Sequence, residues 1–142
     1  MAKEKKSAQI IWKGERLQFR GILGSGYTFD LESPAGREAG SPMELLLAGV
    51  AGCTAMDVVH VLRKMRQPLQ GLTVEIEGTR AEENPKVYTE VDIVYVVQGA
   101  EVDPAAVEKA INLSQETYCS ASVMFREAGV SLRTDYRIEA GG

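Results

Sequence analysis

Three short runs of apolar or alternating residues occupy the first third of the chain, at residues 10–12, 17–19 and 27–31. Alternation of apolar and polar residues at period two is typical of a strand with one buried face. Turns that contain glycine separate these runs at residues 13–15 and 24–26, and glycine is a strong turn signal. The pattern therefore predicts three consecutive strands joined by tight turns.

A long helix is predicted to start at Ser41 and to end near Met65. Ser41 is suited to the N-cap, Pro42 to the first helical position, and Glu44 lies where a capping box places an acidic side chain. Pro68 follows the helix and closes it. The first four turns are apolar nearly all round, which is typical of a buried helix. One small sheet gives little cover for such a helix, so we expect a homodimer that buries it.

Alternating residues return in the second half of the chain. The runs at residues 72–76 and 91–97 are separated by Asn84 and Pro85, and this arrangement predicts a long antiparallel hairpin. A further alternating run at residues 130–138 predicts the last strand.

A second helix is predicted to start after Asp103 and to extend as far as Gly129, with a break near Cys119. The order of elements is then βββ-α-ββ-α-β. Strands in runs, with only two long helices, indicate an α+β fold with antiparallel sheets. No linker or repeat divides the chain, so residues 1–142 are expected to form a single domain, with residues 1–6 as a flexible tail.

Composition and charge argue against several kinds of partner. The chain has 44% hydrophobic and 25% charged residues and a net charge of −4, which is unfavourable for binding nucleic acid or an anionic membrane. Its longest apolar run, Leu45–Met56, ends at Asp57 and is shorter than the roughly 20 residues of a membrane span. The N-terminal residues lack the apolar segment of a secretory signal. We therefore expect a cytoplasmic protein that binds neither nucleic acid nor membrane.

The chemistry of the chain is expected to lie on its two cysteines. The single histidine, His60, excludes a multi-histidine metal site, and the two cysteines do not form a CxxC pair. Cys53 lies in the middle of the apolar helix, where a structural cysteine is a common alternative to a reactive one. Gly49 and Gly52 are compatible with both interpretations of Cys53. They leave space beside its sulfur, either for a second helix or for a substrate.

A reactive cysteine needs a cause for thiolate formation, such as a positive charge or a hydrogen-bond donor. Asp57, one turn after Cys53, is negatively charged and therefore disfavours the thiolate. His60 lies about 10 Å from Cys53 along the helix axis, which is too far for a direct pair. An activating group must then come from elsewhere, and an arginine is the obvious candidate. Cys119 lies in a polar segment, Thr117–Ser122. It is either a packing residue or the resolving partner of Cys53, and the sequence leaves open whether the two form a disulfide.

Two segments resemble a known family at these residues. The segment Ser41–Cys53 resembles the signature helix of the osmotically inducible protein C and organic hydroperoxide resistance (OsmC/Ohr) family, and Thr117–Ser120 resembles its second cysteine segment. The element order is similar along nearly the whole chain. The residues of both segments are most similar to those of a less characterised, OsmC-like branch of the family.

The resemblance implies an intertwined homodimer with two long central helices and two active sites at the interface. It also implies a peroxidase that reduces organic hydroperoxides in the oxidative stress response, without a metal or bound cofactor. Cys53 would attack the peroxide, Cys119 would resolve the product, and a dithiol, typically a lipoyl group, would reduce the disulfide. Glu44 matches the acidic residue near the family's site, although a capping role alone also explains it.

The family's activating arginine lies in the first hairpin, and this chain offers Arg16 and Arg20 there and Arg37 in the following loop. Arg16 is favoured because it lies just past the first turn.

Two other functions remain open at this stage. In the first, the protein binds a hydrophobic ligand or senses redox state, and the space beside Gly49 and Gly52 holds that ligand without peroxidase turnover. In the second, the protein exchanges disulfides with other proteins. Buried cysteines argue against exchange, because it requires access to the sulfur.

Overall fold

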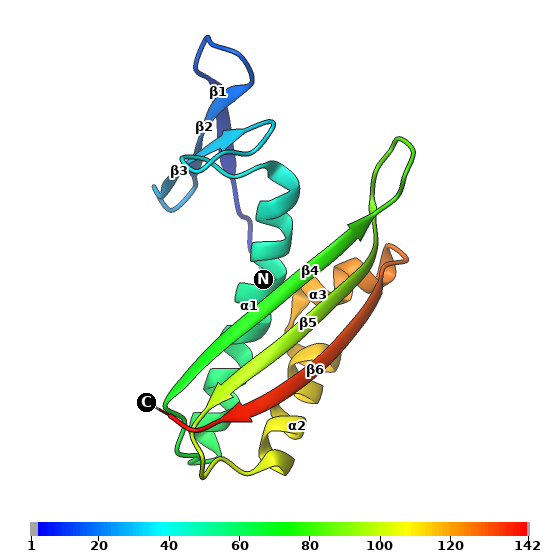
Figure 1. Ribbon diagram of the computed structural model, residues 1–142. Helices are drawn as coiled ribbons and strands as arrows, with labels where there is room; N and C mark the ends of the chain where they lie inside the picture. Colours follow the sequence, from blue (N-terminus) through cyan, green and yellow to red (C-terminus); the bar gives the residue numbers. More distant parts are fainter. Residues whose placement is uncertain (1–2, 142) are drawn as a thin grey trace. The chain divides into compact units, whose positions relative to one another are not determined.

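The computed structural model describes residues 3–141, which contain two three-stranded sheets (Figure 1). The first sheet is made of β1, β2 and β3, and the second of β4, β5 and β6. Contacts divide the chain into two compact units, Met1–Leu46 and Leu47–Gly142. The elements in order are β1 (Ala8–Trp12), β2 (Gln18–Leu23), β3 (Thr28–Glu32), helix α1 (Pro42–Lys64), β4 (Gly71–Arg80), β5 (Tyr88–Gln98), helix α2 (Pro104–Leu113), the π-helical turn η1 (Ser114–Tyr118), helix α3 (Ser120–Glu127) and β6 (Ser131–Glu139).

The first unit is an antiparallel meander in which β2 is the central strand. Gly21 of β2 lies opposite Phe29 of β3 in the register, and the Phe29 ring fills the space that a Cβ at Gly21 would occupy. Strand β1 is exposed along its whole length, including Ile10 and Trp12. The three strands that the sequence predicts here are confirmed. Residues 1 and 2 of the predicted tail lie outside the described residues.

Helix α1 begins with the capping box that the sequence predicts. The Ser41 N–H donates to Glu44 Oε1 at 3.0 Å, and the Glu44 N–H donates to Ser41 Oγ at 3.2 Å. Two N–H groups that the first turn leaves without helical partners are satisfied in this way. The helix continues without a break to Lys64, close to the predicted end.

Helix α1, which is expected to need a second copy of the chain for full burial, is only partly buried within this chain. Its buried residues are Val50, Ala51, Thr54, Val58, Val61 and Leu62, whereas Met56 is 75% exposed. Among the described residues, α1 is also the one helix whose length and composition would suffice for a membrane span, a test that the core helix of a soluble protein passes as well. A large apolar part of α1 therefore lacks cover within the chain.

In the second unit, β4 and β5 form the long antiparallel hairpin that the sequence predicts. The expectation that both sheets are antiparallel is wrong for the last strand, because β6 pairs with β5 in parallel, from Glu90 opposite Ser131 to Gln98 opposite Glu139. The segment between β5 and β6 explains the direction. Helices α2 and α3 carry the chain back along the sheet, and parallel neighbours require such a crossover connection.

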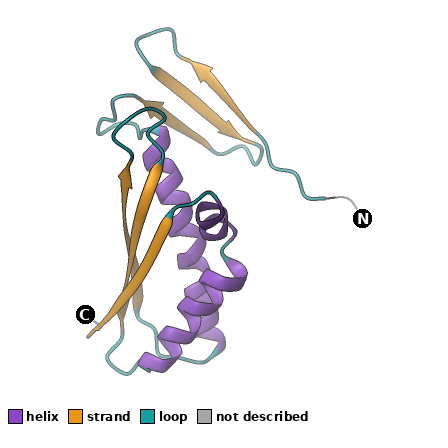
Figure 2. Cartoon of the chain, turned by 90° about the vertical axis from the view of Figure 1, so that its right-hand side faces the viewer, coloured by secondary structure: helices purple, strands orange, loops and turns teal. Residues whose placement is uncertain are grey.

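The core of the second unit lies between this sheet and its helices. Figure 2 shows α1, α2 and α3 on one face of the β4-β5-β6 sheet. Alternate residues of β5 that include Val91, Ile93 and Tyr95 are fully buried or nearly so, and Val58 and Leu62 of α1 are equally buried. Full burial of an aliphatic side chain contributes about 1.5–3 kcal/mol. The sheet and helices therefore hold α1 and the α2–α3 segment in a defined mutual position.

The second predicted helix is broken close to Cys119, as the sequence predicts. Helix α2 passes into η1, and Cys119 itself is extended, with φ −81° and ψ 92°. Cys119 is then the N-cap of α3, because its sulfur accepts a hydrogen bond from the Ser122 N–H. The cysteine thus lies at a joint in the helical layer rather than within a regular helix.

Candidate functional site

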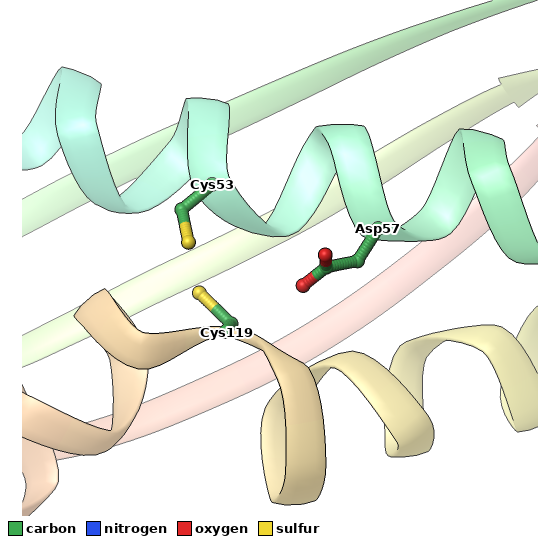
Figure 3. A group of neighbouring side chains, drawn as sticks. All are labelled: Cys53, Asp57 and Cys119. Carbon is green, nitrogen blue, oxygen red and sulfur yellow. The ribbon is translucent and has the colours of Figure 1, made fainter. Parts of the chain in front are cut away.

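Cys53, Asp57 and Cys119 direct their side chains toward one another between α1 and the η1–α3 joint (Figure 3). One sulfur from each cysteine and one carboxylate oxygen of Asp57 all lie within 4.8 Å of one another. Both cysteines are free thiols. The structure therefore brings together the two cysteines that the sequence selects, and it adds an acidic residue to them.

Local structure explains why these three side chains meet. Cys53 and Asp57 are four residues apart on α1, and residues at that spacing lie on the same face of a helix. Cys119 leaves the helical path, and its N–H donates to the Ser114 carbonyl at 2.7 Å, which closes η1. Continuing α2 as a regular helix would not produce this extended residue facing α1.

Cys119 is fully buried, with no exposed side-chain surface. Burial raises the pKa of the Cys119 thiol, and neighbouring Cys53 raises it further. Ser122 partly offsets this effect, because its hydroxyl and its N–H donate hydrogen bonds to the Cys119 sulfur at 3.0 and 3.4 Å. Cys119 is therefore a protonated thiol at neutral pH in a site that nonetheless offers two donors to the sulfur.

Cys53 is half-buried and is the more accessible thiol of the pair. A Cβ built on Gly49 or Gly52 would meet no atom of this chain within 4 Å. The space that the sequence predicts beside Cys53 is thus open within the chain. The two cysteines therefore differ in access: Cys53 is partly exposed, whereas Cys119 is fully buried.

A buried network of hydroxyl groups lies beneath the three residues. Thr54 Oγ1 lies 2.7 Å from both Tyr95 Oη and Ser114 Oγ, and Ser114 Oγ donates to an Asp57 carboxylate oxygen at 2.9 Å. Each hydroxyl has a single proton. The bond from Ser114 to Asp57 therefore requires Thr54 to donate to Ser114 and Tyr95 to donate to Thr54. The result is a directed chain of hydrogen bonds that ends at the Asp57 carboxylate.

Gln115 and Arg126 complete this network. The Gln115 side-chain amide donates to Thr54 and to Tyr95, at 3.3 and 3.0 Å. Arg126 of α3 donates to the side-chain oxygen of Gln115 at 2.8 Å and to the Gln115 carbonyl. Burial raises the pKa of Tyr95, so it remains a donor. Among the described residues, no buried side-chain nitrogen or oxygen lacks a partner, and the network therefore adds rigidity without orphaned polar groups.

Asp57 also lines a cavity of about 430 Å³ next to the cysteines. His60 and Lys64 of α1, Lys109 and Leu113 of α2, and Tyr118 of η1 contribute to its walls. Apolar side chains and cationic groups both line it. The Asp57 carboxylate is thus held by Ser114 while it faces a space large enough for water or a small ligand.

The remaining residues that the sequence selects lie in the first unit. Glu44 is engaged in the capping box with Ser41, and Arg20 forms an ion pair with Asp30 at 3.4 Å. Arg16 and Arg37 line a polar cavity of about 380 Å³ in that unit. The action of any of these residues on Cys53 stays a prediction.

The part of the site that sequence analysis missed is Asp57 with its partner Ser114, and Ser122, which donates to the Cys119 sulfur. By its charge alone, Asp57 is a group unfavourable to a Cys53 thiolate. Its position four residues after Cys53 was a usable signal, because that spacing places both on one face of α1. Ser114 had no local signal, because its partner Asp57 lies on a separate element. Ser122 binds Cys119 three residues earlier in the chain, within the polar segment that the sequence selects. The same three residues, Cys53, Asp57 and Cys119, form a group of possible metal ligands in the described part of the chain.

Comparison with known proteins identifies relatives along nearly the whole chain. The family model described as OsmC-like protein matches residues 35–135. The chain is 36% identical to Protein YhfA of Escherichia coli strain K12 over 133 residues, which cover 94% of this chain and 98% of that protein.

Solved structures agree with these matches. A hypothetical protein from Aquifex aeolicus VF5 has a TM-score of 0.86 and 31% identity, with 99% of this chain and 100% of that one covered. An organic hydroperoxide resistance protein OsmC from Legionella pneumophila has a TM-score of 0.72 and 20% identity, with coverage of 96% and 98%. The Legionella protein supports the fold alone, because its sequence identity to this chain is low.

Proposed function

This chain belongs to the OsmC-like protein family, and on that premise we propose that it is a thiol-dependent peroxidase that reduces organic hydroperoxides. The observation that carries the proposal is the proximity of an accessible Cys53 to a buried Cys119, with sulfurs within 4.8 Å of each other. Family members with solved structures include proteins named for organic hydroperoxide resistance.

The two cysteines have the positions that such a reaction requires. The Cys53 thiolate attacks the outer peroxide oxygen, the O–O bond breaks, and the alcohol leaves with a proton, so that Cys53 becomes a sulfenic acid. The Cys119 thiol then attacks the Cys53 sulfur, a disulfide forms, and water leaves. A dithiol, of which a lipoyl group is our candidate, returns both cysteines to thiols by disulfide exchange.

The disulfide requires only a local movement. Sulfur atoms within 4.8 Å of each other must close by less than about 2.8 Å to reach a bond of about 2.05 Å. Cys53 is held by a regular helix, whereas Cys119 is an extended residue between η1 and α3. We therefore assign the movement to the Cys119 joint.

Activation of Cys53 is assigned to an arginine of the first unit, with Arg16 as the candidate that we favour. Arg20 is engaged with Asp30, while Arg16 and Arg37 face a polar cavity. Replacing each arginine with alanine in turn and measuring the rate of Cys53 oxidation tests the assignment. The activating residue is the one whose loss slows oxidation by about 100-fold or more, as expected for removal of a group that stabilises charge in the transition state.

The active form is proposed to be an intertwined homodimer in the cytoplasm. Each unit has apolar surface that lacks cover: Ile10, Trp12 and Tyr27 in the first, and Met56 and Met124 in the second, are all more than half exposed. Burial of such side chains is the main source of free energy in stable dimers. Light scattering coupled to size-exclusion chromatography measures the oligomeric state directly, and a monomer at micromolar concentration contradicts this part of the proposal.

A second candidate function is supported by the cavity beside Asp57. Its volume of about 430 Å³ and its apolar side chains, Val61, Met65 and Leu113, suit a small hydrophobic ligand. In this alternative the protein binds or senses a ligand without peroxidase turnover, and the cysteines do not take part in catalysis.

The deciding experiment measures loss of cumene hydroperoxide and of hydrogen peroxide with a dithiol reductant. Wild type and Cys53→Ser are compared. The proposal requires rapid loss of the organic peroxide in wild type and none above background in Cys53→Ser. Equal rates in the two proteins exclude Cys53 as the nucleophile. No turnover in wild type favours the ligand-binding alternative.

A further inference from the structure

We propose that the reduced pair Cys53 and Cys119, together with Asp57, forms a binding site for a divalent cation of the zinc class, and that oxidation of the pair releases the cation. The three side chains come from two separate parts of the chain and converge on one point (Figure 3). This inference does not depend on peroxidase activity, because it concerns the reduced protein and its three donor atoms.

The spacing of the donor atoms is close to that of a tetrahedral zinc site. With zinc–sulfur bonds of about 2.3 Å and zinc–oxygen bonds of about 2.0–2.2 Å, two sulfurs lie about 3.8 Å apart, and a sulfur and an oxygen about 3.5 Å apart. In this protein all three atoms lie within 4.8 Å of one another. Each pair therefore has to close by no more than about 1.3 Å, which side-chain rotation and the Cys119 joint can supply.

The charges of the three groups also favour a cation. Two thiolates and a carboxylate at this separation repel one another when all are ionised. A dication between them reverses this effect, because coordinated thiols lose their protons. Two sulfur ligands select zinc and similar ions over magnesium or calcium, which prefer oxygen ligands alone.

The ligands are already oriented by hydrogen bonds from their neighbours. Ser122 donates twice to the Cys119 sulfur, and Ser114 donates to the Asp57 carboxylate. Thr54 fixes Ser114 in turn. Such outer partners hold metal ligands in position and keep them anionic in established metal sites. Ser114 uses one oxygen of the Asp57 carboxylate, which has a second oxygen able to bind a cation.

The site has an open side through which an ion can enter. Cys53 is half-buried, and Asp57 lines the adjacent cavity of about 430 Å³. Three protein ligands leave the fourth position for water, as in zinc sites that are not purely structural. The group contains no histidine, and its three residues are not adjacent in the sequence, so no multi-histidine motif indicates it.

Cation binding and the disulfide exclude each other, because the disulfide uses both sulfurs. In the oxidation, two thiolates and one organic hydroperoxide take up two protons and give a disulfide, an alcohol and water, and the cation is set free. A bound cation in turn occupies the Cys53 electron pair that would attack the peroxide. The reduced protein then retains the ion until an oxidant reaches the pair.

The experiment titrates Zn²⁺ into the reduced, metal-free full-length protein against a chromophoric chelator, with Co²⁺ as an optical probe in parallel. We expect one ion per chain and a sulfur-to-cobalt charge-transfer band. Cys119→Ser and Asp57→Asn should each weaken binding at least about tenfold, and Ser122→Ala by about 10–100-fold, the range for loss of an outer hydrogen-bond partner. The control His60→Gln, on the same cavity but outside the group, should bind as wild type does.

A second arm uses no variant, so that a folding defect cannot explain its outcome. Wild type oxidised with diamide, which takes two hydrogens from the two thiols, should release the ion and fail to rebind it until a dithiol is added. Unchanged affinity in Asp57→Asn or in the oxidised protein would overturn the site. So would a cobalt spectrum without the charge-transfer band, or loss of binding in His60→Gln. Peroxidase activity is measured separately, so its absence leaves these results unaffected.

Discussion

Thr54 and Ser114 place their hydroxyl oxygens 2.7 Å apart, and this contact joins α1 to η1 beside the cysteine pair. Thr54 directly follows Cys53 in the chain, and Ser114 closes the turn that ends at Cys119. Both hydroxyl groups are fully buried. The mutual position of the two cysteines therefore depends on a polar contact as well as on apolar packing.

Replacing Thr54 with valine should test this dependence. The change keeps the shape of the side chain but leaves Ser114 without its donor and Tyr95 without its acceptor. We expect the free energy of unfolding to fall by about 1–3 kcal/mol, because buried polar groups would lose their partners. Urea denaturation measures the loss. Thr134→Val, at an exposed position on β6, is the matched control and should change stability by less than about 0.5 kcal/mol.

Replacing Cys119 with serine should separate the two chemical steps of the proposed reaction. Cys53 remains half-buried and able to react, so the first oxidation should proceed. The disulfide cannot form, and a sulfenic acid on Cys53 should accumulate and be trapped by a dimedone-type reagent, as mass spectrometry can show. Cys53→Ser is the control and should trap nothing. A disulfide-linked dimer as the main product would point to resolution between chains instead.

The reduced protein should become less stable in alkaline solution. Burial raises the pKa of the Cys119 thiol above its ordinary value of 9.0 and that of Tyr95 above 10.0. Both groups lose a proton more easily in the unfolded chain. Their contribution to stability is therefore complete below the unfolded pKa and is lost as the pH rises through the folded pKa. For each group the loss is up to about 1.4 kcal/mol per pH unit.

Urea denaturation of the reduced protein between pH 7 and pH 11 measures this loss of stability. Cys119→Ala should show a shallower decline above pH 9 than wild type, because one of the two groups is gone. A decline of equal slope in both proteins would assign the effect to other groups.

Substitutions at Ser41 and Glu44 should separate the capping role of Glu44 from a catalytic one. Glu44→Gln keeps an oxygen that can accept from the Ser41 N–H, but it removes the negative charge. Ser41→Ala keeps the charge and removes the cap, and should destabilise the protein by about 1 kcal/mol. If Glu44 only caps α1, Glu44→Gln should retain the rate of Cys53 oxidation. A rate at least about tenfold lower at unchanged stability would assign Glu44 a role in the reaction.

The sequence alone determined the features that depend on neighbouring residues. The start of α1 was predictable because Ser41, Pro42 and Glu44 satisfy the first turn through bonds three residues apart. The hairpins followed from period-two alternation and their turns. The break near Cys119 and the choice of both cysteines as the candidate site were also available from local residues and from the family resemblance.

Tertiary structure decided the features that depend on residues far apart in the chain. The direction of β6 was one, because the same alternating pattern suits a parallel or an antiparallel neighbour, and the α2–α3 crossover selects the parallel one. The site is another. Asp57 becomes part of it only because η1 brings Ser114 and Cys119 against α1. Side-chain periodicity records which face of an element is buried, whereas the partner on the other side of that face is chosen by packing.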